Sequence, residues 1–215
     1  MNKKKNISGL HLITHPCEDF CPFEQAQKAL EGGCDWVQLR MKKYEADEII
    51  SEAKKISSLK LKANFRLIIN DHPELALQSN ADGVHLGKHD VSPREVRKML
   101  GDDFIIGGTA NTIEDIEGLA EQGVDYVGLG PFRFTETKEN LSPVLGLEGY
   151  LKIFQEMSLR NINVPVIGIG GVVYKDIPEM MKTGLHGLAV SSAILKSSST
   201  ADETRKWLKA IQQSI

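Results

Sequence analysis

The feature that most constrains the fold is a series of short apolar segments, rich in β-branched residues, that recurs along the whole chain. The apolar residues in these segments are continuous rather than alternating, which indicates strands buried on both faces, as in a parallel sheet. There are eight such segments, at residues 10–14, 36–40, 66–70, 83–87, 104–108, 126–130, 164–170 and 187–192.

Stretches with helical periodicity lie between most of these segments, and such alternation predicts repeated strand–helix–strand units. Several of the stretches end in the same way, with a glycine a few residues before the next strand, or with Asn80 in its place. Eight strands in 215 residues, with no linker between them, predict a single (β/α)₈ TIM barrel spanning residues 1–215. An open doubly wound sheet is the alternative, because closure is not visible in a sequence. Examples of the helical stretches are 22–33, 46–62, 92–100, 112–123, 174–184 and 201–213.

Composition narrows the class of protein. A net charge of −3 argues against a general nucleic-acid binder, which carries a basic face. No apolar segment approaches the roughly 20 residues of a membrane helix, and none follows the basic start as a secretory signal requires. An odd number of cysteines, Cys17, Cys21 and Cys34, then favours reduced thiols and a cytoplasmic location. The pattern leaves open whether the chain forms a homo-oligomer.

Polar residues gather just after the predicted strands. In a TIM barrel the active site lies at the C-terminal ends of the strands, so these residues are expected on one rim. After strands two to five they are Gln38, Arg40, Lys42, Asn70, Asp71, Lys88, His89, Asp90, Thr109 and Asn111, and strands seven and eight end at Gly170-Gly171 and Ser191-Ser192.

The chemistry of this rim points to phosphate and a divalent cation. Asp71 and Asp90, with Asn70 beside them, suit Mg²⁺, which prefers oxygen ligands. Arginine, lysine and hydroxyl side chains suit phosphate oxygens, and glycine turns after strands seven and eight suit a phosphate held by backbone N–H groups. The loop 131–138 adds hydroxyls and the ammonium of Lys138 to the same rim.

Each feature also has a purely structural interpretation. Asn70-Asp71 can be a turn or a helix cap, and Arg40 can form an ordinary salt bridge. The segment 135–138 can be a solvated loop. His85 and His89 have metal-like spacing but straddle a strand end, so packing or solvent contact is the expectation for both. The functional interpretation depends on all these features sharing one rim.

Six segments together resemble thiamine phosphate synthase, in order and spacing, from about residue 9 to 195. They are QLRMK (38–42), IND (69–71), DGVHLGKHD (82–90), DYVGLGPFRFTETK (125–138), IGIGG (167–171) and AVSSAI (189–194). The resemblance implies a TIM-barrel transferase that joins a hydroxymethylpyrimidine diphosphate to a thiazole phosphate with Mg²⁺, giving thiamine phosphate and pyrophosphate. Its expected partners are these small molecules, with no nucleic acid and no membrane.

The resemblance also implies a role for each matching residue. Arg40, Lys42 and Lys138 are expected to be catalytic, and Asp71 and Asp90 to bind the metal. The pyrimidine diphosphate would be held by Gln38, Leu39, Arg40, Met41, Lys42, Asn70, Thr109 and Lys138. The thiazole phosphate would be held by Thr135, Glu136, Thr137, Gly171, Ser191 and Ser192.

Two positions depart from the family pattern. The family commonly reads Ser-x-His-Thr after strand five, where this chain has Thr109-Ala110-Asn111-Thr112, and Phe134 stands where a proline is common. Thiazole tautomerases share the fold and rely on a histidine near residue 111, so its absence weighs against that isomerase. A non-catalytic barrel that binds a phosphorylated ligand is the third alternative; it would need no metal carboxylates.

Overall fold

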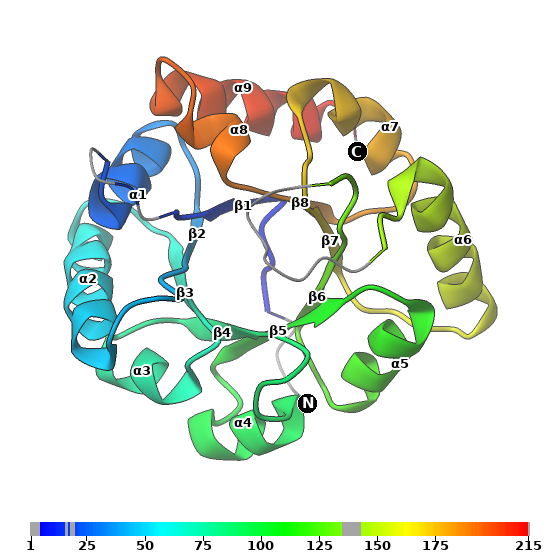
Figure 1. Ribbon diagram of the computed structural model, residues 1–215, viewed down its shortest axis with the longest axis horizontal. Helices are drawn as coiled ribbons and strands as arrows, with labels where there is room; N and C mark the ends of the chain where they lie inside the picture. The colour runs from blue at the N-terminus through cyan, green and yellow to red at the C-terminus, as the bar shows by residue number, and fades with distance from the viewer. Residues whose placement is uncertain (1–4, 16, 18–19, 135–142, 215) are drawn as a thin grey trace.

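The computed structural model describes residues 5–15, 17, 20–134 and 143–214. Within these residues, eight parallel strands pair in chain order, and β8 pairs with β1 to close the barrel. Figure 1, which looks down the barrel, shows the helices as a ring outside the strands. Closure decides between the two predicted architectures: the fold is a (β/α)₈ barrel and not an open sheet.

Every predicted apolar segment overlaps a strand, and β5 alone among these strands runs beyond its segment. The strands are β1 (Leu10–Ile13), β2 (Trp36–Leu39), β3 (Arg66–Asn70), β4 (Gly83–Leu86), β5 (Ile105–Ala110), β6 (Tyr126–Leu129), β7 (Val166–Ile169) and β8 (Gly187–Val190). The described helices are α1 (Pro22–Glu31), α2 (Ala46–Ser58), α3 (Pro73–Gln78), α4 (Pro93–Leu100), α5 (Ile113–Glu121), α6 (Gly146–Leu159), α7 (Ile177–Met181), α8 (Ser192–Leu195) and α9 (Thr200–Gln212), with short 3₁₀ turns η1 (Leu59–Leu61) and η2 (Tyr174–Asp176). Helices α6 and α8 were not among the stretches named from periodicity, and α3 was indicated only by the turn at Asn80 that follows it.

The repeated turn before the strands behaves as the sequence predicts. Gly33, Gly123 and Gly184 all adopt positive φ after their helices, at 93°, 78° and 105°. Asn80, which replaces the glycine before β4, also has a positive φ, of 56°. Glycine and, less often, asparagine accept this left-handed conformation, which reverses the chain after a helix.

The inside of the barrel changes from apolar to polar along the strands. Side chains alternate between the two faces of a strand, so residues two apart point the same way. On β2 the inward residue Trp36 is followed by Gln38, and on β3 Ile68 is followed by Asn70. The apolar members form an interior cluster of Ile7, Ile13, Trp36, Ile68, Ile105, Tyr126, Ile167 and Ala189.

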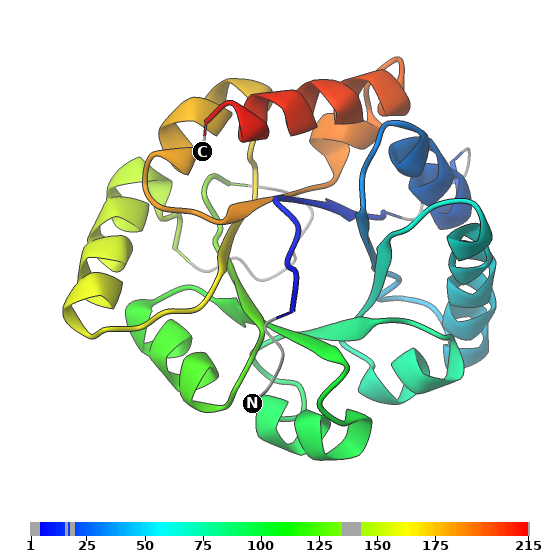
Figure 2. The ribbon, with the colours of Figure 1, turned by 180° about the vertical axis from the view of Figure 1, so that it is seen from behind.

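The N-terminal mouth of the barrel is covered by the chain itself. Figure 2, from behind, shows the segment before β1 running across this mouth. Ile7 in this segment is buried in the interior cluster, and the Lys5 ammonium lies 3.0 Å from a carboxylate oxygen of Asp125. The polar C-terminal end is therefore the end at which a ligand can enter.

A membrane-spanning helix has to be both long and apolar. In the part of the chain that the structure describes, no helix meets both requirements.

Candidate active site

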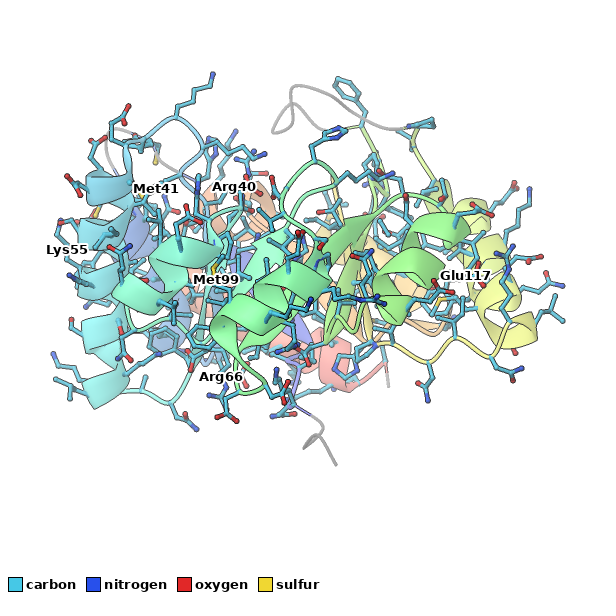
Figure 3. All side chains as sticks on the ribbon, turned by 90° about the horizontal axis from the view of Figure 1, so that it is seen from below. Arg40, Met41, Lys55, Arg66, Met99 and Glu117 are labelled. Carbon is cyan, nitrogen blue, oxygen red and sulfur yellow. The ribbon has the colours of Figure 1, made fainter. Side chains whose placement is uncertain are left out.

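The predicted rim residues in the described part of the chain lie together at the C-terminal end of the barrel. Figure 3, a side view, shows Arg40 and Met41 towards one end of the barrel and Arg66, the first residue of β3, at the opposite end. One mouth of the barrel therefore brings together residues at the end of a strand or just beyond it, from β2, β3, β4, β5, β7 and β8. They are Gln38, Arg40, Lys42, Asn70, Asp71, Asp90, Thr109, Gly171, Ser191 and Ser192.

Gln38 and Asn70 form a buried amide pair on neighbouring strands. The Gln38 amide nitrogen donates to the Asn70 side-chain oxygen over 2.7 Å. This leaves the oxygen of Gln38 as an acceptor and the NH₂ group of Asn70 as a donor for other partners. The pair can therefore accept from an amino group at one position and donate to an anionic oxygen at the next.

Asp71 and Asp90 bring two carboxylates to the same place above β3 and β4. A methyl group placed at Gly87 would lie 3.7 Å from an oxygen of Asp71 and 3.2 Å from one of Asp90. The backbone N–H of Gly87 donates to that Asp90 carboxylate over 2.6 Å. Asp71 itself has a φ of 68°, a conformation that non-glycine residues adopt mainly where the surroundings impose it, often at functional sites.

The electrostatics of this pair favour a bound cation. Burial raises the pKa of Asp71, the Lys42 ammonium opposes the shift, and the nearby Asp90 carboxylate adds to it. Lys42 is 3.3 Å from Asp71, but both side chains keep some solvent exposure, so this contact is a weak compensation. Two carboxylates with incomplete charge compensation form a site that suits Mg²⁺, which commonly takes one or two carboxylates and fills its other positions with water and phosphate oxygens.

A cavity of about 110 Å³ lies at the same end of the barrel and is lined by residues at the ends of β1, β2, β5, β6, β7 and β8. Arg40 and Thr109 line it from one side, and Gly170, Gly171, Ser191 and Ser192 from the other. The Ser191 hydroxyl is buried and has no hydrogen-bond partner among the residues with described positions. Because an unpaired buried hydroxyl is costly, this group suits a water or a ligand oxygen as its partner.

Only a glycine fits at position 171, because of both the backbone conformation and the close neighbours. Its φ of 69° is left-handed, and a Cβ there would lie 2.9 Å from both Cβ and O of Arg133 and from O of Phe134. Arg133 is anchored in turn, since its guanidinium donates over 2.9 and 3.0 Å to the two oxygens of Asp176. The start of the loop after β6 is thus fixed against the cavity.

The Thr109 hydroxyl is within hydrogen-bonding distance of a buried histidine, His85. The His85 Nε2 atom lies 3.0 Å from the Thr109 hydroxyl, and the His85 Nδ1 atom lies 3.0 Å from the hydroxyl of Tyr126. Sequence reasoning expected His85 to be a packing or solvent-exposed residue, and it is indeed buried, but it also touches a predicted ligand-binding side chain. His89, in contrast, is exposed.

Asn111, the departure from the family pattern, is not among the described residues that line the cavity. Its amide nitrogen donates to the carbonyl of Gly130, and its backbone N–H donates to Asp115 over 2.8 Å. Lys88 pairs with the same Asp115 carboxylate at 2.6 Å. Asn111 therefore links the ends of β5 and β6.

Two predicted ligand-binding residues do not direct their side chains to the mouth. Leu39 and Met41 are buried in an apolar cluster with Val37 and Leu67, between the barrel and its helices. Only their backbone can face a ligand, as part of the run that carries Gln38, Arg40 and Lys42. Four further predicted residues, Thr135, Glu136, Thr137 and Lys138, lie outside the described residues.

Comparison with known proteins decides the family. The model of the thiamine monophosphate synthase family matches residues 10–194. The chain belongs to the thiamine monophosphate synthase family. A thiamine-phosphate synthase of Bacteroides fragilis is 50% identical over 200 residues, which are 93% of this chain and 98% of that protein. One of Flavobacterium johnsoniae is 54% identical over 190 residues, or 87% of each chain.

Solved structures agree with this family membership. The thiamine phosphate pyrophosphorylase of Pyrococcus furiosus superposes with a TM-score of 0.83 at 28% identity and covers 96% of both chains. A 3-hexulose-6-phosphate synthase superposes with a TM-score of 0.68 at 15% identity, a likeness of fold alone.

Proposed function

We propose that this member of the thiamine monophosphate synthase family is the transferase that makes thiamine phosphate. A ring nitrogen of a thiazole phosphate bonds to the methylene carbon of an aminopyrimidine methyl diphosphate. The carbon–oxygen bond to the diphosphate breaks, and pyrophosphate leaves with the bonding electrons. The curated relatives at about half identity carry the name of this activity.

The observation that carries the proposal is the meeting of Asp71 and Asp90 beside Lys42 at the mouth of the barrel. A protein that only holds a phosphorylated ligand has no use for two adjacent carboxylates, which repel phosphate. A reaction that releases pyrophosphate does need them, because the carboxylates bind a cation that neutralises the negative charge of the leaving group.

The pyrimidine diphosphate is assigned to the side of the rim formed by β2 to β5. The paired amides of Gln38 and Asn70 supply one acceptor and donors, which suits an aminopyrimidine that meets an anionic group nearby. Arg40 and Lys42 supply positive charge to the diphosphate oxygens, and Thr109 supplies a hydroxyl. Lys138 is assigned to the same diphosphate from the sequence alone.

Asp71 and Asp90 would hold Mg²⁺, with diphosphate oxygens and water as the remaining ligands. When bound, Mg²⁺ supplies positive charge that stabilises the departing pyrophosphate. The protein's own contribution is to hold the two carboxylates together, through the N–H of Gly87 and the left-handed backbone of Asp71.

The thiazole phosphate is assigned to the part of the cavity that lies between β7 and β8, while Arg40 and Thr109, which line the same cavity, are assigned to the diphosphate. Gly171 and Ser191 line the part between β7 and β8, and the unpaired Ser191 hydroxyl is a donor suited to a phosphate oxygen. Loops after strands seven and eight commonly bind phosphate in TIM barrels. Ser192 and, from the sequence alone, Thr135, Glu136 and Thr137 are assigned to the same phosphate.

This arrangement calls for no nucleophile from the protein. An electron-rich aminopyrimidine can delocalise the charge that forms at its methylene carbon as pyrophosphate departs. The site then has two tasks, which are to stabilise charge on the leaving group and to place the thiazole nitrogen near that carbon. Charged groups at the mouth serve the first task, and the cavity serves the second.

The isomerase alternative lacks the histidine that the family resemblance leads one to expect near residue 111. Moving a proton on a thiazole needs a side chain that can give and take one at neutral pH. Asn111 cannot do so, and its amide is directed to Gly130.

The proposal is tested by mixing the purified protein with both substrates and Mg²⁺ and detecting thiamine phosphate by mass. Arg40→Ala and Arg66→Ala form a matched pair, since each removes one guanidinium, from opposite ends of the barrel (Figure 3). Arg40→Ala should abolish most turnover while Arg66→Ala keeps it. A folded wild-type protein that forms no thiamine phosphate, or equal losses in the two variants, would refute the proposal.

A further inference from the structure

A chain of three hydrogen-bonding groups links the barrel interior to the cavity. The Tyr126 hydroxyl lies 3.0 Å from Nδ1 of His85, and Nε2 of His85 lies 3.0 Å from the Thr109 hydroxyl. Thr109 lines the cavity together with Arg40. The direction in which protons are donated along this chain decides what Thr109 can offer to a ligand.

Tyr126 sets that direction. Its ring is fully buried, and burial raises the pKa of its hydroxyl far above the usual value, so the group keeps its proton. Among the described residues its hydroxyl has one hydrogen-bond partner, which is His85. A buried O–H that donates to nothing is costly, so Tyr126 donates to Nδ1 of His85.

The remaining steps follow from the chemistry of imidazole. A nitrogen that accepts carries no proton, so the proton of a neutral His85 is on Nε2. Nε2–H then donates to the oxygen of Thr109. Because Thr109 accepts this bond, its own hydrogen is not used by His85 and can be donated into the cavity. In the opposite tautomer, Thr109 would donate to His85 and have no hydrogen for a ligand.

We propose that Tyr126 and His85 are positioning residues that fix the Thr109 hydroxyl as a hydrogen-bond donor to the diphosphate of the pyrimidine substrate. The inference deepens the proposed function and rests on it. It gives a role to a tyrosine hydroxyl that is buried inside the barrel.

Close packing holds Tyr126 and His85 in place. A Cβ at Gly107 would overlap the Tyr126 ring, and one at Gly128 would lie 3.0 Å from Cε1 of His85, so two glycines make room for these rings. His11 lies edge-on to Tyr126, with ring centroids 5.2 Å apart. The Tyr126 and His85 rings therefore have little freedom to reorient when a ligand binds.

Steady-state kinetics with both substrates provides the first test. Tyr126→Phe removes only the donor at the start of the chain, and Tyr150→Phe is the matched control. Tyr150 is also a buried tyrosine, but its hydroxyl donates to the carbonyl of Leu129. Tyr126→Phe should raise the KM for the pyrimidine diphosphate about three- to tenfold, as expected for weakening one hydrogen bond to a charged oxygen. The KM for the thiazole phosphate should not change, and Tyr150→Phe should leave both values unchanged.

A double-mutant cycle then asks whether Tyr126 acts through Thr109. In a Thr109→Val background there is no hydroxyl to orient, so adding Tyr126→Phe should have no further effect on the KM for the pyrimidine diphosphate. An undiminished effect in that background, or equal increases in both KM values, would overturn the proposal.

The position of the proton is read directly, without turnover and without a variant that has to fold. In protein labelled with ¹⁵N-histidine, the imidazole nitrogens of His85 should show the proton on Nε2. A proton on Nδ1 alone would overturn the inference even if the enzyme is active. Absence of thiamine phosphate formation by the wild-type protein would instead refute the proposed function.

Discussion

Gly171→Ala is the substitution whose effect can be worked most fully from the structure. The new methyl group brings two separate costs. An alanine at a φ of 69° is strained, by about 1–2 kcal/mol. Its Cβ would also lie 2.9 Å from three atoms of Arg133 and Phe134, two of them backbone oxygens, so the neighbouring segment must move. Overpacking of this kind typically costs a further 1–3 kcal/mol or so.

Gly123→Ala separates these two costs. Gly123 has a similar φ of 78°, but nothing lies within 4 Å of the position its Cβ would take. This control should lose only the conformational part, about 1–2 kcal/mol. For a chain of this size, each kcal/mol lowers the melting temperature by about 2–4 °C. The melting temperature of Gly171→Ala should therefore fall roughly twice as far as that of Gly123→Ala.

The assay combines thermal unfolding with kinetics at a temperature where both variants are folded. In Gly171→Ala, the Arg133–Phe134 backbone or Gly171 itself must shift, and Gly171 lines the part of the cavity assigned to the thiazole phosphate. The KM for the thiazole phosphate should therefore rise, by about tenfold for each 1.4 kcal/mol of binding lost. Gly123 follows α5, away from the mouth, and its variant should keep the wild-type KM. Equal melting temperatures for the two variants, with an unchanged KM, would show that Gly171 is an ordinary turn residue.

Three further predictions concern the other half of the site. Thr109→Ser should be nearly neutral, whereas Thr109→Val should cost about 1.5–3 kcal/mol in kcat/KM; equal activities would make Thr109 a packing residue. Asp71→Ala and Asp90→Ala should each lose most turnover, only partly restored by excess Mg²⁺. Wild-type rates of both at limiting Mg²⁺ would refute the metal assignment. Lys138→Ala should lower kcat more than it raises KM, and Lys138→Arg should recover only part of the loss; a change confined to KM would exclude Lys138 from the chemistry.

The strands and the rim were predictable from sequence because both depend on local patterns. A strand buried on both faces must be apolar throughout, so β3 and β6 are visible as runs such as 66–70 and 126–130. The rim follows from the same runs, since a polar residue just beyond a parallel strand has to lie at its C-terminal end. Asn70 and Asp71 are placed in this way without any knowledge of their contacts.

Contacts between distant segments could not be predicted. His85 pairs with Tyr126 across 41 positions and with Thr109 across 24. Nothing in the sequence near His85 distinguishes it from a histidine packed in the core. The one available signal was the position of His85 in β4, where it faces inward on the strand next to that of Thr109. This signal is useful only once the closure of the barrel and the register of its strands are known. Barrel closure was likewise unpredictable, because the pairing of β1 with β8 leaves no local mark.

Asn111 shows how the end of one strand limits the chemistry of the site. Continued alternation along β5 would place residue 111 on the same inward face as Thr109. The strand instead ends at Ala110, and the chain turns into α5, where Thr112 caps the helix by accepting from the N–H of Asp115. The side chain of residue 111 then meets the Gly130 carbonyl, and an amide can donate there without titrating. With no acid–base group at that point, charge stabilisation of a departing pyrophosphate is the chemistry that the remaining residues support.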